Sequence, residues 1–133
     1  MKEYTGRHAR AGLSQKLPPI ECFPNQFPGY VIVIENPEFT SVCPRTGLPD
    51  FGIIRIEYTP AKLCLELKSI KLYFHAYRSL GIFQENAVNR ILADIVRACR
   101  PVWAQVTGEF NFRGGMKTTI NATYPRRKKR LEM

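Results

Sequence analysis

Clustered metal ligands are the first thing that the sequence lacks. Its 133 residues include only two histidines and four cysteines, and no two cysteines form a CxxC pair. Structural and catalytic zinc sites usually take Cys and His ligands that lie close together in the sequence, so no metal site is predicted. The four cysteines are spread along the chain as Cys22, Cys43, Cys64 and Cys99.

Secretory, membrane and dinucleotide-loop signals are missing as well. The chain shows no secretory leader and no long apolar run, so its thiols are expected to stay reduced in the cytoplasm. No Gly-x-Gly-x-x-Gly segment follows an expected strand, which excludes a Rossmann phosphate loop. Internal repeats are absent too, and the length fits one domain.

Acidic residues are few, yet the excess of positive charge is concentrated in one place. The net charge is +9, and five of the basic residues form the run at 126–130. Without that run, 15 basic residues face 11 acidic ones, a net charge of +4. We interpret residues 126–133 as a solvated basic tail and do not expect nucleic acid as a partner. A non-catalytic RNA-binding module driven by this run is an alternative.

The first 28 residues differ in composition from the rest. They are polar, basic and rich in proline, which predicts an extended arm without regular structure that covers a neighbouring subunit. The domain proper is expected over residues 29–125. The prolines of the arm are Pro18, Pro19, Pro24 and Pro28.

Hydrophobic periodicity predicts the elements of this domain. Alternating residues indicate strands, and apolar residues at i, i+3, i+4 and i+7 indicate helices. The resulting order, β-β-α-α-β-β, predicts an α+β fold in which a four-stranded antiparallel sheet carries two helices on one face. Its two free sheet edges favour assembly into a ring of subunits. The expected strands are 30–35, 52–59, 102–110 and 116–124. The first expected helix opens at Glu66, shows its helical period over 70–77 and is ended by Gly81, and the second is 83–99.

A cysteine and an aspartate lie seven residues apart in the loop between the first two expected strands. Pro44 and Pro49 each fix a backbone dihedral angle, and Gly47 leaves one free position between them. Such a restrained loop suits a nucleophile, Cys43, with a proton donor, Asp50. The alternative is a half-buried structural cysteine in a turn.

Charged residues at three other places could bind ligands. Lys68 and Lys71 are three apart on one helical face and could hold a phosphate, although such pairs are often only solvated. Glu85 offers two acceptor oxygens to the paired N–H donors of a guanine-like ring, or simply favours the start of its helix. Arg113 precedes two glycines, where a guanidinium can bind phosphate or lie exposed in a hairpin turn.

Four separated segments together resemble one family. The stretch 66–73 reads ELKSIKLY, the loop reads CPRTGLPDFG, and FQEN and RGG follow downstream. These motifs, in identity and order, are similar to those of the NADPH-dependent 7-cyano-7-deazaguanine reductases of queuosine biosynthesis, called QueF. The resemblance covers residues 36–125 and the single-module form of that family.

The resemblance implies the tunnelling fold, assembled as two stacked pentamers with active sites between subunits. It implies that Cys43 attacks the nitrile carbon of 7-cyano-7-deazaguanine to form a thioimidate, while Asp50 supplies a proton and two NADPH molecules deliver hydride. It further implies substrate-binding residues Leu65, Glu66, Leu67, Gln84 and Glu85, and cofactor-binding residues Lys68, Lys71 and Arg113.

The chain departs from the family pattern at two positions near these motifs. Gln84 stands where many members have histidine, and Phe112 stands where proline usually precedes the Arg-Gly-Gly turn. A QueF-like amidinotransferase, which acts on tRNA and makes archaeosine, shares the cysteine and aspartate and is the nearest alternative. That branch lacks the lysine-bearing motif, which is intact here.

Overall fold

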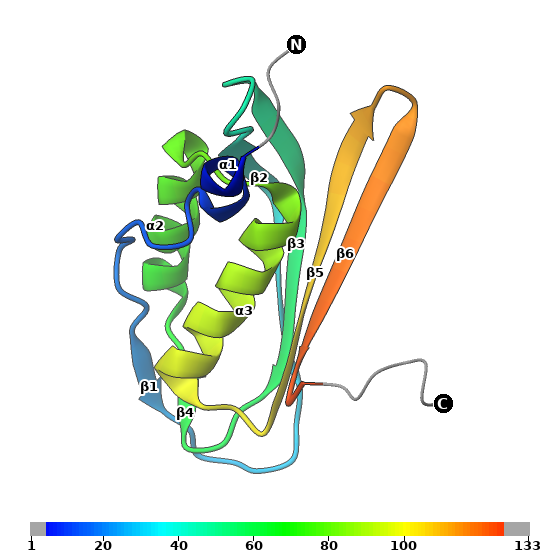
Figure 1. Cartoon of the computed structure of the whole chain (residues 1–133). Coiled ribbons are helices and arrows are strands. Elements are labelled where there is room, and N and C mark those ends of the chain that lie inside the picture. The colour runs from blue at the N-terminus through cyan, green and yellow to red at the C-terminus, as the bar shows by residue number, and fades with distance from the viewer. Residues whose placement is uncertain (1–4, 127–133) are drawn as a thin grey trace.

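An antiparallel sheet with two helices packed on one face forms the framework of the chain (Figure 1). The structure is a computed structural model that describes residues 5–126. The expected α+β architecture and the order of its main elements are confirmed. The sheet has the strand order β2-β3-β5-β6, with β2 at Ile32–Val42, β3 at Pro49–Thr59, β5 at Trp103–Arg113 and β6 at Met116–Tyr124. The helices are α2 at Leu67–Ala76, followed by the 3-10 turn η1 at Tyr77–Ser79, and α3 at Gln84–Cys99.

Alternating burial along β3 shows how the sequence separates the two faces of this sheet. Ile54, Ile56 and Tyr58 are buried under the helices, whereas Ile53 and Arg55 between them face the other side. Successive side chains of a strand point to opposite faces, so one alternating segment builds a core face and an open face together.

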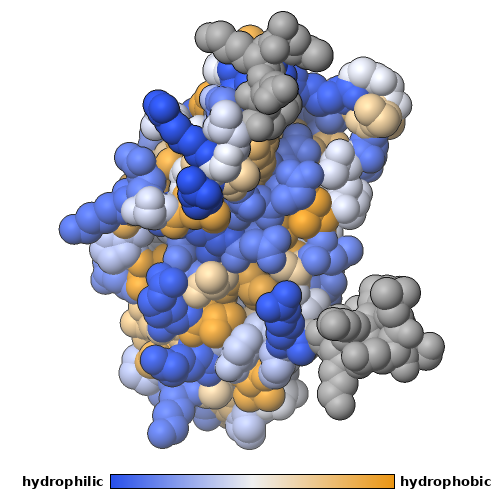
Figure 2. All heavy atoms as spheres, viewed as in Figure 1, coloured by the Kyte–Doolittle hydropathy of each residue, from blue (hydrophilic) through white to orange (hydrophobic). Residues whose placement is uncertain are grey.

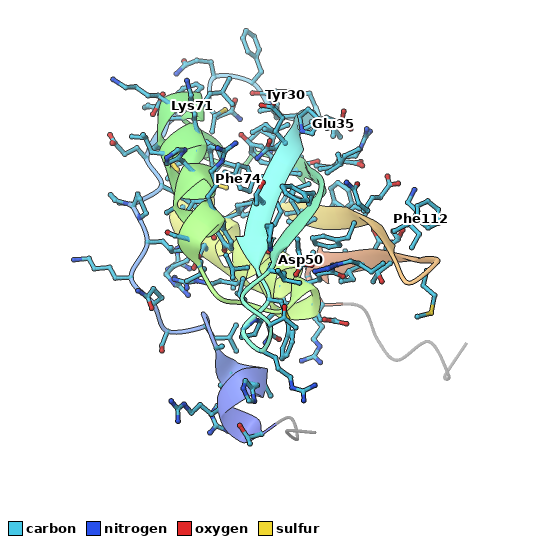
Figure 3. The ribbon with its side chains drawn as sticks, turned by 90° about the horizontal axis from the view of Figure 1, so that it is seen from above. Tyr30, Glu35, Asp50, Lys71, Phe74 and Phe112 are labelled. Carbon is cyan, nitrogen blue, oxygen red and sulfur yellow. The ribbon has the colours of Figure 1, made fainter. Side chains whose placement is uncertain are left out.

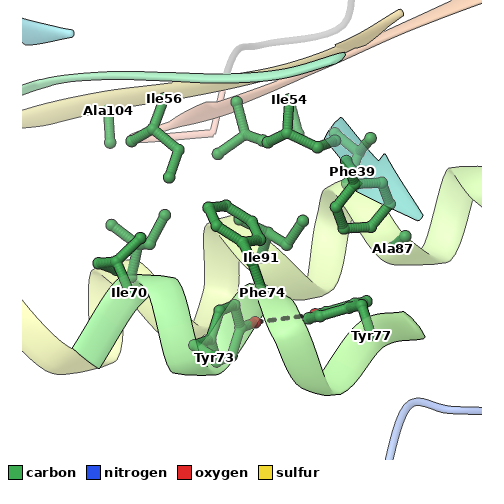
Figure 4. Packing of buried hydrophobic residues seen from close by; sticks show 14 of the residues in the cluster. Phe39, Ile54, Ile56, Ile70, Tyr73, Phe74, Tyr77, Ala87, Ile91 and Ala104 are labelled. Atoms are coloured by element: carbon green, nitrogen blue, oxygen red, sulfur yellow. Dashed lines mark hydrogen bonds between the residues drawn. The ribbon is translucent and has the colours of Figure 1, made fainter. Parts of the chain in front are cut away.

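The helices bury the stripes that their periodicity predicts. In α3 the stripe includes Val88, Ile91 and Ile95, and in α2 it includes Ile70 and Phe74. Figure 4 shows Ile70, Phe74 and Ile91 of this set facing the sheet, and all five belong to one core cluster with the buried sheet residues. Apolar burial of this kind contributes roughly 25 cal/mol per Å², which is the main term holding the helices on the sheet.

The arm is more ordered than its composition predicts. We expected no regular structure before residue 29, and this expectation is wrong: α1 occupies Gly6–Arg10, and β1 at Cys22–Pro24 pairs with β4 at Leu63–Leu65. Proline is compatible with this small sheet because Pro24 ends an edge strand. The domain boundary at Gly29 stays a prediction.

Two side chains of α3 bind backbone carbonyls of the arm and hold the arm on this helix. Asn86 donates to the carbonyl of Ala9 at 2.6 Å, and Arg90 donates to the carbonyls of Gly12 and Gln15. Asn86 and Arg90 are four residues apart, so they project from one face of the helix. Within one chain the arm therefore crosses its own α3.

The surface of this helical side is mostly hydrophilic, with apolar residues scattered between charged ones (Figure 2). The open face of the sheet also exposes large apolar side chains, including Val33, Phe51 and Ile53. Strands β2 and β6 each lack a neighbour on one side within residues 5–126. No helix in this described part is long and apolar enough to cross a membrane.

Candidate active site

The loop that carries Cys43 is shorter than the sequence suggests, because both flanking strands continue toward it. Val42 pairs with Pro49, and Ser41 pairs with Asp50. Asp50 is therefore part of β3, while Cys43 is the first residue after β2. The strand pairing brings the expected nucleophile and proton donor to one end of the sheet.

Backbone hydrogen bonds close this loop on Cys43 itself. The Cys43 N–H donates to the carbonyl of Leu48, and the Gly47 N–H donates to the carbonyl of Cys43, both at 2.9 Å. Gly47 has a φ of 73°, a left-handed conformation that favours glycine. These two hydrogen bonds hold the loop closed over residues 43–48.

The start of α3 is attached to the same loop. The Val42 N–H donates to the carbonyl of Leu80 at 3.0 Å, and the Ile82 N–H donates to the carbonyl of Val42 at 2.9 Å. These bonds form a parallel bridge between Val42 and Gly81. Because α3 begins at Gln84, its first turn lies beside the Cys43 loop.

The thiol of Cys43 has a lowered pKa. Partial burial raises it, but hydrogen bonds from the Thr46 side chain and from the backbone N–H groups of Thr46 and Arg45 outweigh this effect. The Thr46 hydroxyl also accepts the N–H of Leu48 at 3.2 Å, which orients it within the loop. Donors that stabilise a thiolate make a cysteine a better nucleophile near neutral pH.

The carboxyl group of Asp50 has the opposite shift. Burial raises its pKa, the Arg113 guanidinium and the Gln84 side chain lower it, and the charge of Glu85 raises it again, so that the pKa ends above its ordinary value. Arg113 donates to Asp50 Oδ1 at 2.7 Å, with the Asp50 side chain only 9% exposed. A carboxyl group that is easier to protonate is suited to donate a proton.

Four of the sequence-predicted residues thus gather around Cys43. These residues are Asp50, Gln84, Glu85 and Arg113. Arg113, for which a cofactor phosphate is the predicted ligand, contacts Asp50 in this chain. The Arg113 guanidinium reaches Asp50 from the β5–β6 hairpin.

The segment 65–71 carries the other predicted residues, at the start of α2. Glu66 caps this helix by accepting the N–H groups of Lys68 and Ser69, which lowers the pKa of its carboxyl group. The Leu65 N–H donates to the Tyr58 hydroxyl at 2.9 Å. Leu67, Lys68 and Lys71 are exposed.

The structure does not bring this segment to Cys43 within one chain. The ten residues of α2 and the three of η1 span about 20 Å, and the Cys43 loop is attached beyond their far end. Lys71 and Asp50 accordingly lie far apart in Figure 3. A groove of about 750 Å³ lies between the arm and the helices, but none of the sequence-predicted site residues lines it.

Sequence reasoning overlooked two polar residues of the loop region. Thr46 follows Cys43 by three residues, a turn spacing at which a hydroxyl can reach back, and this signal could have found it. Ser41 was named only as the start of the loop, and its position opposite Asp50 depends on strand register. Within residues 5–126, no group of three or more His, Cys, Asp or Glu side chains could hold a metal ion.

A thiol with a lowered pKa beside a carboxyl group with a raised one is the arrangement of an enzyme that forms a covalent adduct through cysteine. The family model described as "QueF-like protein" matches residues 49–129, more than half of the chain. The chain belongs to the QueF family.

Curated relatives match over nearly their whole length. The "NADPH-dependent 7-cyano-7-deazaguanine reductase" of Elusimicrobium minutum (strain Pei191) is 57% identical over 125 residues, which cover 93% of this chain and 95% of the relative. The protein of the same name from Chloroherpeton thalassium (strain ATCC 35110 / GB-78) is 53% identical, over 79% of this chain and 92% of the relative. That of Chlorobaculum tepidum is 54% identical, over 82% and 95%.

A solved structure shares the fold. The apo form of an archaeosine synthase described as QueF-Like superposes with a TM-score of 0.65 at 22% identity, covering 70% of this chain and 91% of that chain. At this identity the match supports the fold alone.

Proposed function

We propose that this chain reduces the nitrile of 7-cyano-7-deazaguanine to an aminomethyl group with NADPH, in the biosynthesis of queuosine. The observation that carries the proposal is the 57% identity to a reductase of this name across 93% of the chain. The geometry at the end of the sheet supports it, since Cys43 and Asp50 have the opposed pKa shifts that covalent addition to a nitrile requires.

Cys43 acts as the nucleophile and Asp50 as the acid. The Cys43 thiolate bonds to the nitrile carbon while the nitrile nitrogen takes the Asp50 proton, which leaves a thioimidate on sulfur and a carboxylate on Asp50. The covalent bond fixes the carbon in place, and a protonated thioimidate carbon accepts hydride more readily than the carbon of a free nitrile. Once this carbon has received a first hydride, its bond to sulfur breaks, so that Cys43 leaves as a thiolate and an imine remains. NADPH, when bound, supplies the two hydrides that convert the thioimidate carbon to the aminomethyl carbon.

Glu85 is suited to hold the base. Its carboxylate is exposed in the first turn of α3, next to the Cys43 loop, and can accept the two adjacent N–H groups on the edge of the deazaguanine ring. Gln84 is proposed to contact the base as well, and its side chain also hydrogen-bonds Asp50, which lowers the pKa of that carboxyl group. An amide there orients the acid and cannot itself titrate.

Lys68 and Lys71 fit the phosphates of the cofactor. Both are exposed and adjacent on α2, and neither forms an ion pair with another side chain of residues 5–126. Arg113 fits this role less well in the present arrangement, since its guanidinium is engaged by Asp50. A phosphate could recruit Arg113 only by drawing it from the acid.

We infer that a second copy of the chain completes the site. About 20 Å of helix separates Glu66 from the Cys43 loop and about 14 Å separates Lys71 from it, so we infer that a neighbouring subunit presents this segment to the thiol. The open edges at β2 and β6 and the exposed Leu67 and Phe112 support contacts between copies. The proposed assembly is a homo-oligomer of two stacked pentamers in the cytoplasm.

The amidinotransferase alternative has less support than the reductase. The archaeosine synthase structure shares only the fold with this chain, whereas the curated reductases match it at 48–57% identity. Most of the basic run 126–130, on which the RNA-binding alternative depends, lies outside the described residues.

The test combines intact mass with cofactor consumption. The purified protein, incubated with 7-cyano-7-deazaguanine alone, should gain the mass of one substrate, and added NADPH should lose its absorbance at 340 nm. Cys43→Ala should show neither change, whereas Cys64→Ala, which alters a buried thiol remote from the loop, should retain both. A wild-type protein that forms no adduct and consumes no NADPH contradicts the proposal.

A further inference from the structure

Ser41 occupies a position directly opposite the proposed acid. It lies two residues before Cys43 at the end of β2 and pairs in register with Asp50 on β3. Residues opposite each other in antiparallel strands project to the same face, with Cβ atoms about 4.5–5.5 Å apart. Ser41 is completely buried and Asp50 is 7% exposed, so both side chains lie on the covered face.

The Ser41 hydroxyl has no hydrogen-bond partner within residues 5–126. It is the one buried side-chain group of this described part for which none is found. A buried hydroxyl without a partner destabilises a fold, whereas alanine would fill nearly the same space without that cost. An unpaired group beside an ionisable residue of the site therefore points to a partner that the reaction creates.

That partner is within reach of a side-chain rotation. Arg113 occupies Asp50 Oδ1, and the Gln84 side chain makes a further bond to the carboxyl group. A carboxylate has about four acceptor positions, which leaves room for another donor. The hydroxyl of a serine can turn about its Cα–Cβ bond without backbone movement.

We propose that Ser41 is a positioning residue whose hydroxyl donates a hydrogen bond to the Asp50 carboxylate once Asp50 has given its proton to the nitrile nitrogen. The inference depends on the proposed function, since it needs Asp50 to act as the acid. The new anion forms in a place with little solvent, where a bond from O–H to O⁻ is stronger than one between neutral groups. The Ser41 hydroxyl has no partner before the proton transfer and donates to the Asp50 carboxylate after it.

The test is Ser41→Ala, with Thr40→Ala as the matched control. Thr40 is the neighbouring residue, but it pairs with the exposed Phe51 and thus lies on the opposite face of the sheet. Ser41→Ala should lower kcat for NADPH oxidation about tenfold or more, since a hydrogen bond to a charged group is lost. Its melting temperature should equal or exceed that of the wild type, and Thr40→Ala should keep wild-type kcat.

The pH dependence separates this role from a structural one. Without the Ser41 donor the Asp50 carboxylate is less stable, so the basic limb of the kcat/KM profile should move to higher pH in Ser41→Ala. An unchanged kcat with an unmoved limb overturns the proposal, and so does a loss of activity that merely follows a lower melting temperature.

A second variant keeps the test valid if alanine impairs folding. Ser41→Cys retains the size of the side chain but replaces the hydroxyl with a weak donor, and it should give an intermediate kcat. Full wild-type kcat in Ser41→Cys counts against the role. A wild-type protein without reductase activity refutes the proposed function instead, which distinguishes the two failures.

Discussion

Arg90 provides a sharp test of how the arm is attached to the domain. Its side chain is 12% exposed and pairs with Asp94, itself 14% exposed, at 3.3 Å, while its guanidinium also binds two carbonyls of the arm. Arg97 contacts the same Asp94 at 3.0 Å but is 71% exposed. The two arginines share one partner and differ in burial.

Burial decides the magnitude expected for each variant. Removing one partner of a buried ion pair costs about 3–5 kcal/mol, whereas an exposed pair contributes about 0–1 kcal/mol. In Arg90→Ala, Asp94 still accepts hydrogen bonds from the Tyr73 hydroxyl, at 2.6 Å, and from Arg97. The expected loss of unfolding free energy is therefore at the lower end of this range, about 3 kcal/mol. For a domain of this size that corresponds to a fall in Tm of about 10 °C.

Urea unfolding followed by circular dichroism measures the difference. Arg90→Ala should lose about 3 kcal/mol of unfolding free energy and Arg97→Ala less than about 1 kcal/mol. Trypsin should also cleave the arm faster in Arg90→Ala, because Gly12 and Gln15 lose their donor. Equal losses in the two variants, or an Arg90→Ala variant as stable as the wild type, would refute the reasoning.

Three further predictions concern the site. Asp50→Asn should bind 7-cyano-7-deazaguanine, as isothermal titration would show, without consuming NADPH. The raised pKa of Asp50 makes the native state lose stability as pH rises above the ordinary carboxyl pKa of about 3.9. Asp50→Asn should therefore be more stable than the wild type at pH 7 and lose this advantage in acid. Thr46→Val removes a donor to the thiol, so the pH midpoint for iodoacetamide labelling of Cys43, located by mass spectrometry, should rise; an unmoved midpoint would show that Thr46 does not stabilise the thiolate. Finally, Cys43→Ala and Lys71→Ala, each inactive or weak alone, should regain activity when dissociated, mixed and reassembled, which a site built within one chain could not do.

Local pattern made the helices and the order of the main elements along the chain predictable. Apolar residues such as Val88, Ile91 and Ile95 recur with the period of a helix, and this period depends only on neighbours in the sequence. The expected start of the second helix at Phe83 differs by one residue from the observed start at Gln84. Strand β6 at Met116–Tyr124 has the bounds predicted for it.

Strand ends were less predictable because pairing decides them. Asn36-Pro37 looks like the end of a strand, yet β2 continues to Val42 through a shift in register between Asn36 and Phe39. An edge strand can accommodate proline in such a bulge. The continuation matters for function, since it places Ser41 opposite Asp50.

The sequence by itself determined the chemistry available to this protein: a restrained loop with a thiol and a carboxyl group, a lysine pair at helical spacing, and an arginine before two glycines. Only the tertiary structure decided which of these groups meet. Arg113 reaches Asp50 across 63 positions of sequence, and the part of α2 that follows Lys68 and Lys71, together with η1, holds these lysines away from Cys43. Side-chain chemistry is a property of each residue, whereas proximity depends on register, packing and the path of the whole chain.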